Sequence, residues 1–498
     1  RRAIAGNSNS AEAHAMLGVI LQAQGDKRGA VVNLERAVHL RDDLVTAWVQ
    51  LANLYKEHED LGQALAACKR AEALEPGRAD ILNTLGLVRQ ARREWDAAET
   101  AFRAAAKGVP MGQPRAQIET NLAALYMVQE RFDVAAESCR AAIEAHPVYP
   151  QAHNILGAAL KAAKDLTGAE AAFRKAYELD PTMTAAQVNL GTVFGMRRQW
   201  DDALACYGRA LEMSPDCAEA MNNRGNVLHS IGRFNDAEID FEQAISIDPE
   251  YADPHLNLGL QLLMQGRWTE AWPEFEWRWR TPQMEPFRRT FIEPQWDGSP
   301  KPGATLLVHA EQGLGDTLNF IRYAPLVAER VGKLVLESQP SLVPLMVGME
   351  GIDAVVAQTE VLPPFDLHVP LLSLPGIFGT TPETVPLAGP YLRPPAGIHV
   401  PLPAAGDGLK VGLVWAGNPR NPFDPSRTAG LARLKALLDV PDCTFYSLQY
   451  GEPGDQIAAE GMQDKIHDLR PLLTDFAATA TSAGAARTAS ASPALHAS

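Results

Sequence analysis

A pattern of small residues that returns every 34 positions constrains the fold of this chain more than any other feature of its sequence. It runs through the first 285 residues in eight copies, with one three-residue slip between the third and fourth copies. Each copy opens on a glycine or alanine, and a second and a third small residue follow 12 and 19 positions later. Small side chains at these spacings let two antiparallel helices, and then the next pair, approach closely. The sequence therefore predicts a stack of helix pairs.

The pattern resembles the tetratricopeptide repeat. The opening residues are Gly18, Ala52, Gly86, Ala123, Gly157, Gly191, Gly225 and Gly259, and Arg278 breaks the third series in the last copy. Prolines end the second helix of five copies, at positions 76, 147, 181, 215 and 249. The resemblance implies a solenoid over residues 1–284, in which each unit buries its apolar face on its neighbours. A concave surface then remains for a protein or peptide partner.

Composition excludes several classes of function. Of the 498 residues, 46% are hydrophobic and 21% are charged, which is typical of a folded globular protein. The net charge of -15 argues against nucleic acid or an anionic membrane as the main ligand. No run of 18 apolar residues predicts a membrane span. The chain opens on Arg1 without an initiator methionine, so we expect a trimmed start and leave an upstream targeting segment open.

The five cysteines form no CxxC pair and no His-rich cluster, so we expect no metal site. Cys68 and Cys139 share the repeat position of Phe102, Phe173 and Phe241, which favours a core role. Unpaired cysteines fit a reducing compartment, and we predict a cytoplasmic location.

An aromatic stretch ends the repeats. It comprises Trp268, Trp272, Phe275, Trp277 and Trp279. We interpret it as a cap over the apolar end of the stack, with stacking on a sugar as the alternative. A proline-punctuated linker over 285–303 follows.

After the linker, short strands alternate with helices, which is typical of an α/β layer fold. We predict strands over 304–309, 333–337, 354–356, 410–415 and 444–448, helices over 316–330, 341–348 and 431–438, and a connector over 365–403. The expected domains are a first lobe over 304–395 and a partial second lobe over 396–476. The Ala/Ser/Thr-rich segment 477–498 is predicted to be disordered, as a natural tail or as the product of a shifted reading frame or incomplete gene.

The first predicted strand runs into Gly313-Leu314-Gly315-Asp316. Glycines at a strand-to-helix junction let backbone amides approach an anionic ligand. Asp316 fits a helix cap equally well. The dinucleotide fingerprint GxGxxG is absent.

Repeats followed by a strand, Gly-Leu-Gly-Asp and a helix resemble bacterial proteins whose C-terminal part is similar to glycosyltransferase family 9, the heptosyltransferase type. The resemblance covers about residues 268–476. It implies the GT-B architecture of two Rossmann-like lobes, with a nucleotide-sugar donor as substrate and no further cofactor. At the matching position, Asp316 is implied as general base, with Gly313 and Gly315 beside the substrate.

A second block, Val411 to Pro419, resembles the first strand and loop of that family's second lobe. The resemblance implies that Gly417, Asn418, Arg420 and Arg427 face the donor phosphates. A core strand followed by a solvated loop is the alternative. The family's later donor-binding segment has no counterpart before the chain ends, so we predict that transfer is impaired.

Asparagines occupy one position of the repeat in four copies: Asn121, Asn189, Asn223 and Asn257. The other copies carry Met16, Gln50, Thr84 and Ile155 there. A row of side-chain amides can clamp the backbone of an extended peptide. The row is similar to that in O-linked N-acetylglucosamine transferases, whereas exposed polar residues on a groove are the plainer interpretation.

Two functions follow as hypotheses. The first is a glycosyltransferase-like protein whose repeats bind a protein or peptide. The second is a non-catalytic scaffold for protein–protein interaction.

Overall fold

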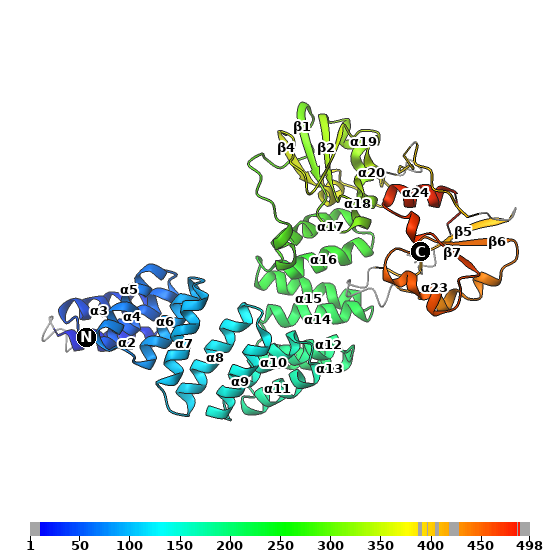
Figure 1. Cartoon of the computed structure of the whole chain (residues 1–498). Helices are drawn as coiled ribbons and strands as arrows, with labels where there is room; N and C mark the ends of the chain where they lie inside the picture. Colours follow the sequence, from blue (N-terminus) through cyan, green and yellow to red (C-terminus); the bar gives the residue numbers. More distant parts are fainter. Residues whose placement is uncertain are drawn as a thin grey trace. The chain divides into compact units, whose positions relative to one another are not determined.

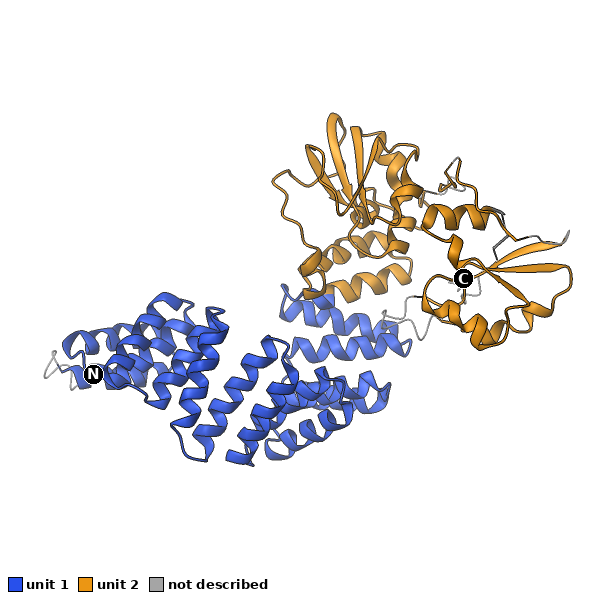
Figure 2. Ribbon diagram, viewed as in Figure 1, with its two compact units in different colours: residues 1–254 blue, residues 255–498 orange. Residues whose placement is uncertain are grey.

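The computed structural model describes residues 10–386, 391–395, 397–403, 408–417, 428–485 and 487–488. The chain divides into two compact units, residues 1–254 and 255–498 (Figure 2). The division falls in the first turn of helix α16, so the solenoid end predicted at residue 284 lies inside the second unit.

The first unit consists of antiparallel helix pairs, as predicted (Figure 1). Its helices are α2 (Ala11–Ala23), α3 (Lys27–Leu40), α4 (Val45–Glu57), α5 (Leu61–Leu74), α6 (Ala79–Ala91), α7 (Trp95–Lys107), α8 (Gln113–Val128), α9 (Phe132–Ala145), α10 (Pro150–Ala162), α11 (Leu166–Leu179), α12 (Thr184–Met196), α13 (Trp200–Met213), α14 (Ala218–Ser230) and α15 (Phe234–Ile247). An eighth pair, α16 (Ala252–Met264) and α17 (Trp268–Phe275), completes the sixteen repeat helices.

The small residues of the repeat lie where helices touch. Every alanine of the second and third series is fully buried. A β-carbon added to Gly86 would lie 2.6 Å from the Phe102 ring, and one added to Gly157 would lie 2.6 Å from the Phe173 ring. These glycines therefore provide the space that the aromatic rings fill.

Local signals explain how each pair turns. The residue seven positions after the opening glycine or alanine has a positive φ, from Gly25 (83°) through Lys164 (66°) to Gly232 (80°). A single left-handed residue ends a helix sharply. Asp26 and Asp165 then cap the next helices through the N–H groups of Gly29 and Gly168. The five prolines each lie two residues beyond the end of a second helix.

In the second unit, α16 and α17 share one apolar core with a parallel sheet. Trp272 and Phe275 are buried there against Leu306, Val308 and Leu336. The Trp272 indole N–H donates to the Thr380 carbonyl oxygen at 2.8 Å. Trp268, Trp272 and Phe275 of the aromatic stretch are thus part of this core. Two 3-10 helices follow it, η1 (Glu276–Arg280) and η2 (Pro282–Phe287).

The first sheet has four parallel strands in the order β3-β2-β1-β4. They are β1 (Lys301–His309), β2 (Val331–Ser338), β3 (Ala354–Ala357) and β4 (Leu367–Pro370). Helical segments α18 (Leu314–Phe320), η3 (Ile321–Tyr323), α19 (Ala324–Ala328), α20 (Val343–Met346), η4 (Leu371–Ser373) and α21 (Leu374–Ile377) accompany them. In register, Val308 lies between Leu336 and Val369.

The second sheet is also parallel and has the order β7-β6-β5-β8. Its strands are β5 (Leu409–Leu413), β6 (Cys443–Ser447), β7 (Ile466–Asp468) and β8 (Arg487–Thr488). The helical segments are η5 (Leu431–Leu434), η6 (Leu437–Asp439), η7 (Glu452–Asp455), α23 (Gln456–Ala459), η8 (Arg470–Leu472) and α24 (Phe476–Ala485). Small parallel sheets therefore follow the repeats.

Four local predictions need correction. Residues 367–370 of the expected connector form strand β4. The helix expected over 316–330 is broken by a 3-10 turn before Pro325, which has no N–H to continue it. The helix expected over 431–438 is two 3-10 turns. Within the segment predicted to be disordered, α24 is helical, because alanine is a strong helix former and Ala477 and Ala478 are buried.

Candidate functional site

Asparagine amides meet across neighbouring repeats in the first unit. The Asn121 side chain on α8 donates to Asn83 Oδ1 on α6 at 2.9 Å. In the same way Asn189 on α12 donates to Asn154 Oδ1 on α10 at 3.3 Å. Lys161 Nζ donates to Asn189 Oδ1 at 3.2 Å. Two members of the predicted row, Asn121 and Asn189, are therefore paired with amides of the preceding repeat. The partners Asn83 and Asn154 were missed, although each lies one position before the row in its own repeat.

The remaining members of the row differ from one another. Asn223 is half-buried and accepts from the neighbouring Asn222 amide at 3.4 Å, and Asn222 also donates to the Tyr251 hydroxyl. Asn257 is half-buried in the second unit. Thr84 is buried at the equivalent position of its repeat, whereas Met16 and Gln50 line an open hollow. The position thus carries an amide in some repeats and an apolar or hydroxyl side chain in others.

In the second unit, the loop after β1 carries the predicted Gly313, Gly315 and Asp316. Both glycines are exposed, and Asp316 is half-buried. Asp316 Oδ2 accepts the N–H of Gly313 at 3.0 Å, so this carboxylate closes the first turn of α18. Gly313 therefore occupies the N-cap position, and Asp316 supports the start of the helix from its third residue.

Amide side chains from the next two strands hold this loop. Gln339, after β2, donates to the Gln312 carbonyl oxygen at 2.9 Å and accepts from the Thr317 hydroxyl at 3.0 Å. Gln358, after β3, donates to the Ala310 carbonyl oxygen at 2.8 Å. The loop at the carboxyl end of this parallel sheet, where α/β proteins bind ligands, is thus hydrogen-bonded to the residues that follow the two next strands.

A buried ionic cluster lies beneath the loop. Arg278 Nη2 donates to Glu311 Oε1 at 2.7 Å, and both side chains are 1% exposed. The same nitrogen donates to the Ser373 hydroxyl at 2.8 Å, and Glu276 accepts from both Arg278 and Ser373. Glu311 Oε2 is buried with no hydrogen-bond partner among the described residues. Burial outweighs the attraction of Arg278 and raises the pKa of Glu311 to about 7.

The face of the sheet opposite the apolar core carries polar residues. His309 pairs in register with Glu337, and His368 pairs with Leu307, so alternation places these three side chains on one face. Phe291 packs on both imidazoles, with ring centroids 5.5 Å from His309 and 4.6 Å from His368. Burial, together with the neighbouring cations, lowers the pKa of His309 to about 3. His309 is therefore neutral at physiological pH.

At the second sheet, the predicted donor residues Asn418, Arg420 and Arg427 lie outside the described residues. Gly417 is exposed, and its N–H donates to Thr428 Oγ1 at 3.3 Å. Gln449 Oε1 accepts the backbone N–H groups of Trp415 and Ala416 at 3.0 and 2.9 Å. Trp415 is buried in the core, which agrees with a packing role.

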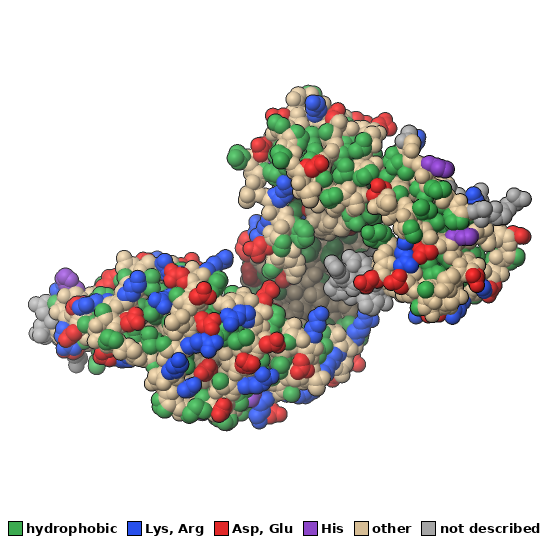
Figure 3. All heavy atoms as spheres, viewed as in Figure 1, with side chains coloured by type: hydrophobic (Ala, Val, Ile, Leu, Met, Phe, Trp, Pro, Cys, Tyr) green, Lys and Arg blue, Asp and Glu red, His purple; other side chains and the backbone are tan. Residues whose placement is uncertain are grey.

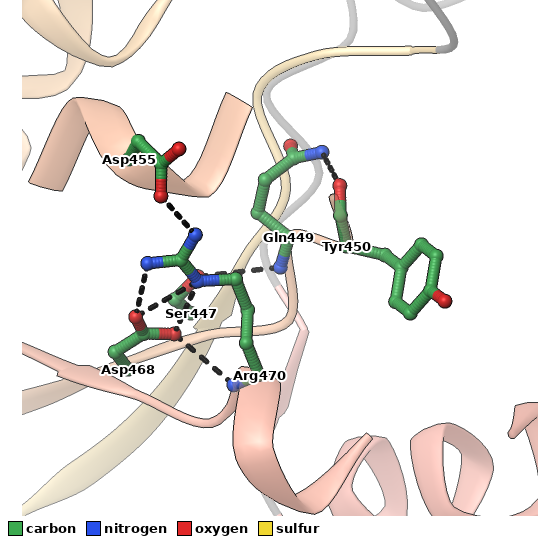
Figure 4. A network of polar contacts seen from close by, with 6 residues as sticks. All are labelled: Ser447, Gln449, Tyr450, Asp455, Asp468 and Arg470. Carbon is green, nitrogen blue, oxygen red and sulfur yellow. Dashed lines mark hydrogen bonds and ion pairs between the residues drawn. The ribbon is translucent and has the colours of Figure 1, made fainter. Parts of the chain in front are cut away.

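Arg470 joins the loops after β6 and β7 (Figure 4). Its guanidinium lies between Asp468 and Asp455, and it donates to Asp468 Oδ2 from two nitrogens. Hydrogen bonds to these carboxylates raise the pKa of Arg470 further above its ordinary value. The Tyr450 side chain points away from this network and is 76% exposed.

Models of the tetratricopeptide repeat match residues 120–184, 188–252 and 241–272. The chain contains tetratricopeptide repeats. Protein FlbA of Caulobacter vibrioides is 26% identical over 236 residues, covering 42% of this chain and 40% of FlbA. The chain therefore spans less than half the length of this curated relative.

Solved tetratricopeptide structures are also similar. One from Parabacteroides merdae is 15% identical, with a TM-score of 0.42 over 51% of this chain and 98% of that one. YrrB, described as a repeat protein with an unusual peptide-binding site, is 21% identical, with a TM-score of 0.30 over 38% of this chain and 95% of its own. Because these scores lie below 0.5, we base the assignment on the helix pairs and the family models.

Two further findings concern the described part of the chain. None of its helices has the length and apolarity that a membrane crossing requires. Within the same residues, no group of three or more His, Cys, Asp or Glu side chains could hold a metal ion.

Proposed function

We propose that the tetratricopeptide repeats capture an extended segment of a partner protein through side-chain amides. The observation that carries this proposal is the pairing of Asn121 with Asn83 and of Asn189 with Asn154 on consecutive first helices. Each pair uses one N–H and one oxygen, and Lys161 also donates to Asn189 Oδ1, whereas an amide offers two N–H groups and two acceptor lone pairs. The pairs fix the amides in place and leave capacity for a peptide backbone.

The experiment measures the affinity of the whole chain for peptides selected from a random 12-residue display library. We expect Asn189→Ala combined with Asn223→Ala to weaken binding about tenfold, the scale of one to two lost hydrogen bonds. Asn226→Ala is the matched control, because Asn226 is exposed on α14 outside the row. An unchanged affinity in the double variant contradicts capture by amides.

A second candidate function is sugar transfer from a nucleotide-sugar. It is favoured by two parallel sheets whose strands follow the same order, with the first strand of each set inside the sheet. Two such sheets fit the two Rossmann-like lobes of a GT-B transferase. Gly313, Gly315 and Asp316 would then serve the acceptor, and Gly417, Asn418, Arg420 and Arg427 the donor. In this role the Asp316 carboxylate would accept the proton of the attacking hydroxyl.

Donor binding distinguishes the two functions. We expect the chain to bind one of the common UDP-, GDP-, ADP- or CMP-sugars saturably. The affinity for this donor should fall in Asp316→Ala or Arg427→Ala. Asp464→Ala is the control, since Asp464 is exposed on the loop before β7. No binding of any donor contradicts sugar transfer and leaves a non-catalytic scaffold.

We further propose a cytoplasmic location, which the unpaired thiols favour. Cell fractionation tests this location.

A further inference from the structure

The first two repeats contain a hollow of about 530 Å³. It lies among α2, α4 and the loops that precede α4 and α6. Leu34, Val45 and Ala47 are buried and form an apolar lining. Met16 and Val19 also line it but are 68% and 46% exposed. Two large apolar side chains are thus displayed to solvent beside a space that could hold another.

Carboxylates surround this apolar surface. Glu12, Asp43 and Glu75 line the hollow together with Arg78, so three carboxylates face one guanidinium among its described lining residues. Arg41 pairs with Glu12 and Asp43, and Arg78 pairs with Glu75. Elsewhere on the repeat surface in view, charges of both signs are intermixed (Figure 3). With Arg41 counted, three carboxylates meet two guanidiniums, so the rim keeps one net negative charge.

We propose that this hollow binds a bulky apolar side chain of the partner segment, flanked by lysine or arginine. The inference rests on the proposed capture of an extended segment by the repeats. It adds which side chains of that segment are recognised. At the row position where later repeats carry paired amides, Met16 and Gln50 line the hollow. An apolar anchor excludes water from the hollow, and the net negative charge of the rim favours a cation beside the anchor.

The test uses four acetylated and amidated 12-residue peptides with a fluorescent label. The central residue is Leu or Ser, and the flanking residues are Lys or Glu. We expect the Leu/Lys peptide to bind the whole chain at least about tenfold more tightly than the Ser/Lys and Leu/Glu peptides. Met16→Asp should remove the advantage of Leu over Ser, and Asp43→Lys the advantage of Lys over Glu.

Matched variants separate these effects from general damage. Met196→Asp places the same change at a methionine that is 54% exposed in another repeat, and Glu137→Lys reverses an exposed charge on α9. Neither substitution should change the order in which the four peptides rank by affinity. Unchanged helical circular dichroism in Met16→Asp shows that the repeats remain folded.

The outcomes distinguish this inference from the proposal beneath it. Equal affinity for all four peptides that still falls in the Asn189 and Asn223 double variant overturns the apolar anchor and retains amide capture. Affinity that depends on Met16 but not on the asparagines supports the anchor and overturns amide capture. No binding of any peptide overturns both.

Discussion

The ring of Phe173 lies against the backbone of Gly157 so closely that a β-carbon there would be 2.6 Å from the ring. Gly191 and Tyr207 have the same relationship at 2.7 Å, and Gly18 and Leu34 at 2.6 Å. In the two copies of the first unit that open on alanine, the residue sixteen positions later is a cysteine, Cys68 or Cys139. Volume is therefore exchanged between the two positions: a large side chain accompanies glycine, and a small one accompanies alanine.

We predict that Gly157→Ala destabilises the repeats by about 1–3 kcal/mol, because the new methyl group displaces the Phe173 ring in a packed core. Combining it with Phe173→Cys recreates the natural Ala123 and Cys139 combination. The double variant should be more stable than the sum of the single effects indicates. Urea denaturation measures both effects.

The control for this change is Gly208→Ala on α13. A β-carbon there meets nothing within 4 Å, so the substitution should stabilise the helix by about 0.5–1 kcal/mol. Equal effects of the two Gly→Ala substitutions would contradict the volume argument.

The second prediction concerns pH. Burial raises the pKa of Glu311 to about 7, so the folded state holds this proton more tightly than the unfolded state. The resulting stabilisation is complete below the unfolded pKa of about 4 and is lost as the pH rises through about 7. Between pH 5 and 8, Glu311 should account for about 2 kcal/mol of lost stability. Glu311→Gln should remove this dependence in urea denaturation of the full chain.

Glu329→Gln is the control, because Glu329 is exposed on the same sheet domain and should leave the pH dependence as it is. Arg278→Met should destabilise the second unit by about 1–3 kcal/mol near neutral pH, since it leaves the buried acceptors Glu311 and Ser373 without their donor. A pH profile that is the same in the wild type and in Glu311→Gln would show that Glu311 does not titrate in this range.

The third prediction concerns thiol reactivity. Burial raises the pKa of Cys68 and Cys139 to about 12, whereas Cys217 and Cys443 are half-buried. The thiolate is the reactive form, so alkylation at pH 8 should label Cys217 and Cys443 first. Mass spectrometry over time locates the label. Early modification of Cys68 or Cys139 would mean that the repeats open locally.

The fourth prediction concerns α24. Phe476 packs against the core of the first sheet, and its N–H approaches the Ser341 carbonyl oxygen at 3.4 Å. We expect Phe476→Ala to cost about 1–3 kcal/mol, less than for a fully buried ring because Phe476 is half-buried. It should also speed proteolysis within residues 476–485. Thr474→Ala is the control, because Thr474 lies near Phe476 in the sequence and is exposed. Equal proteolysis of the two variants would contradict the packing role.

The helix pairs could be predicted because every copy of the repeat carries the same sequence signals. The small residues, the turn position and the prolines return in phase, so one copy supports the next. Short elements lack that support. Strand β4 has four residues and ends at Pro370, which reads as a connector, and an alanine-rich segment such as α24 suits a helix as well as a tail.

The contacts of the candidate site were harder to predict. Glu311 and Arg278 are 33 residues apart, and only the fold brings them together. The sequence did carry one signal: Arg278 interrupts a series of buried alanines. The paired amides were missed for a related reason, because Asn83 and Asn154 belong to a neighbouring position of the repeat and their partners lie in the next copy.

The core that α16 and α17 share with the first sheet has a consequence for evolution. All its described members follow His255, so the last helix pair packs against the first sheet in one core. Recombination between earlier copies could lengthen or shorten the array without opening that core. The number of repeats can thus change between lineages while the packing around the first sheet stays the same.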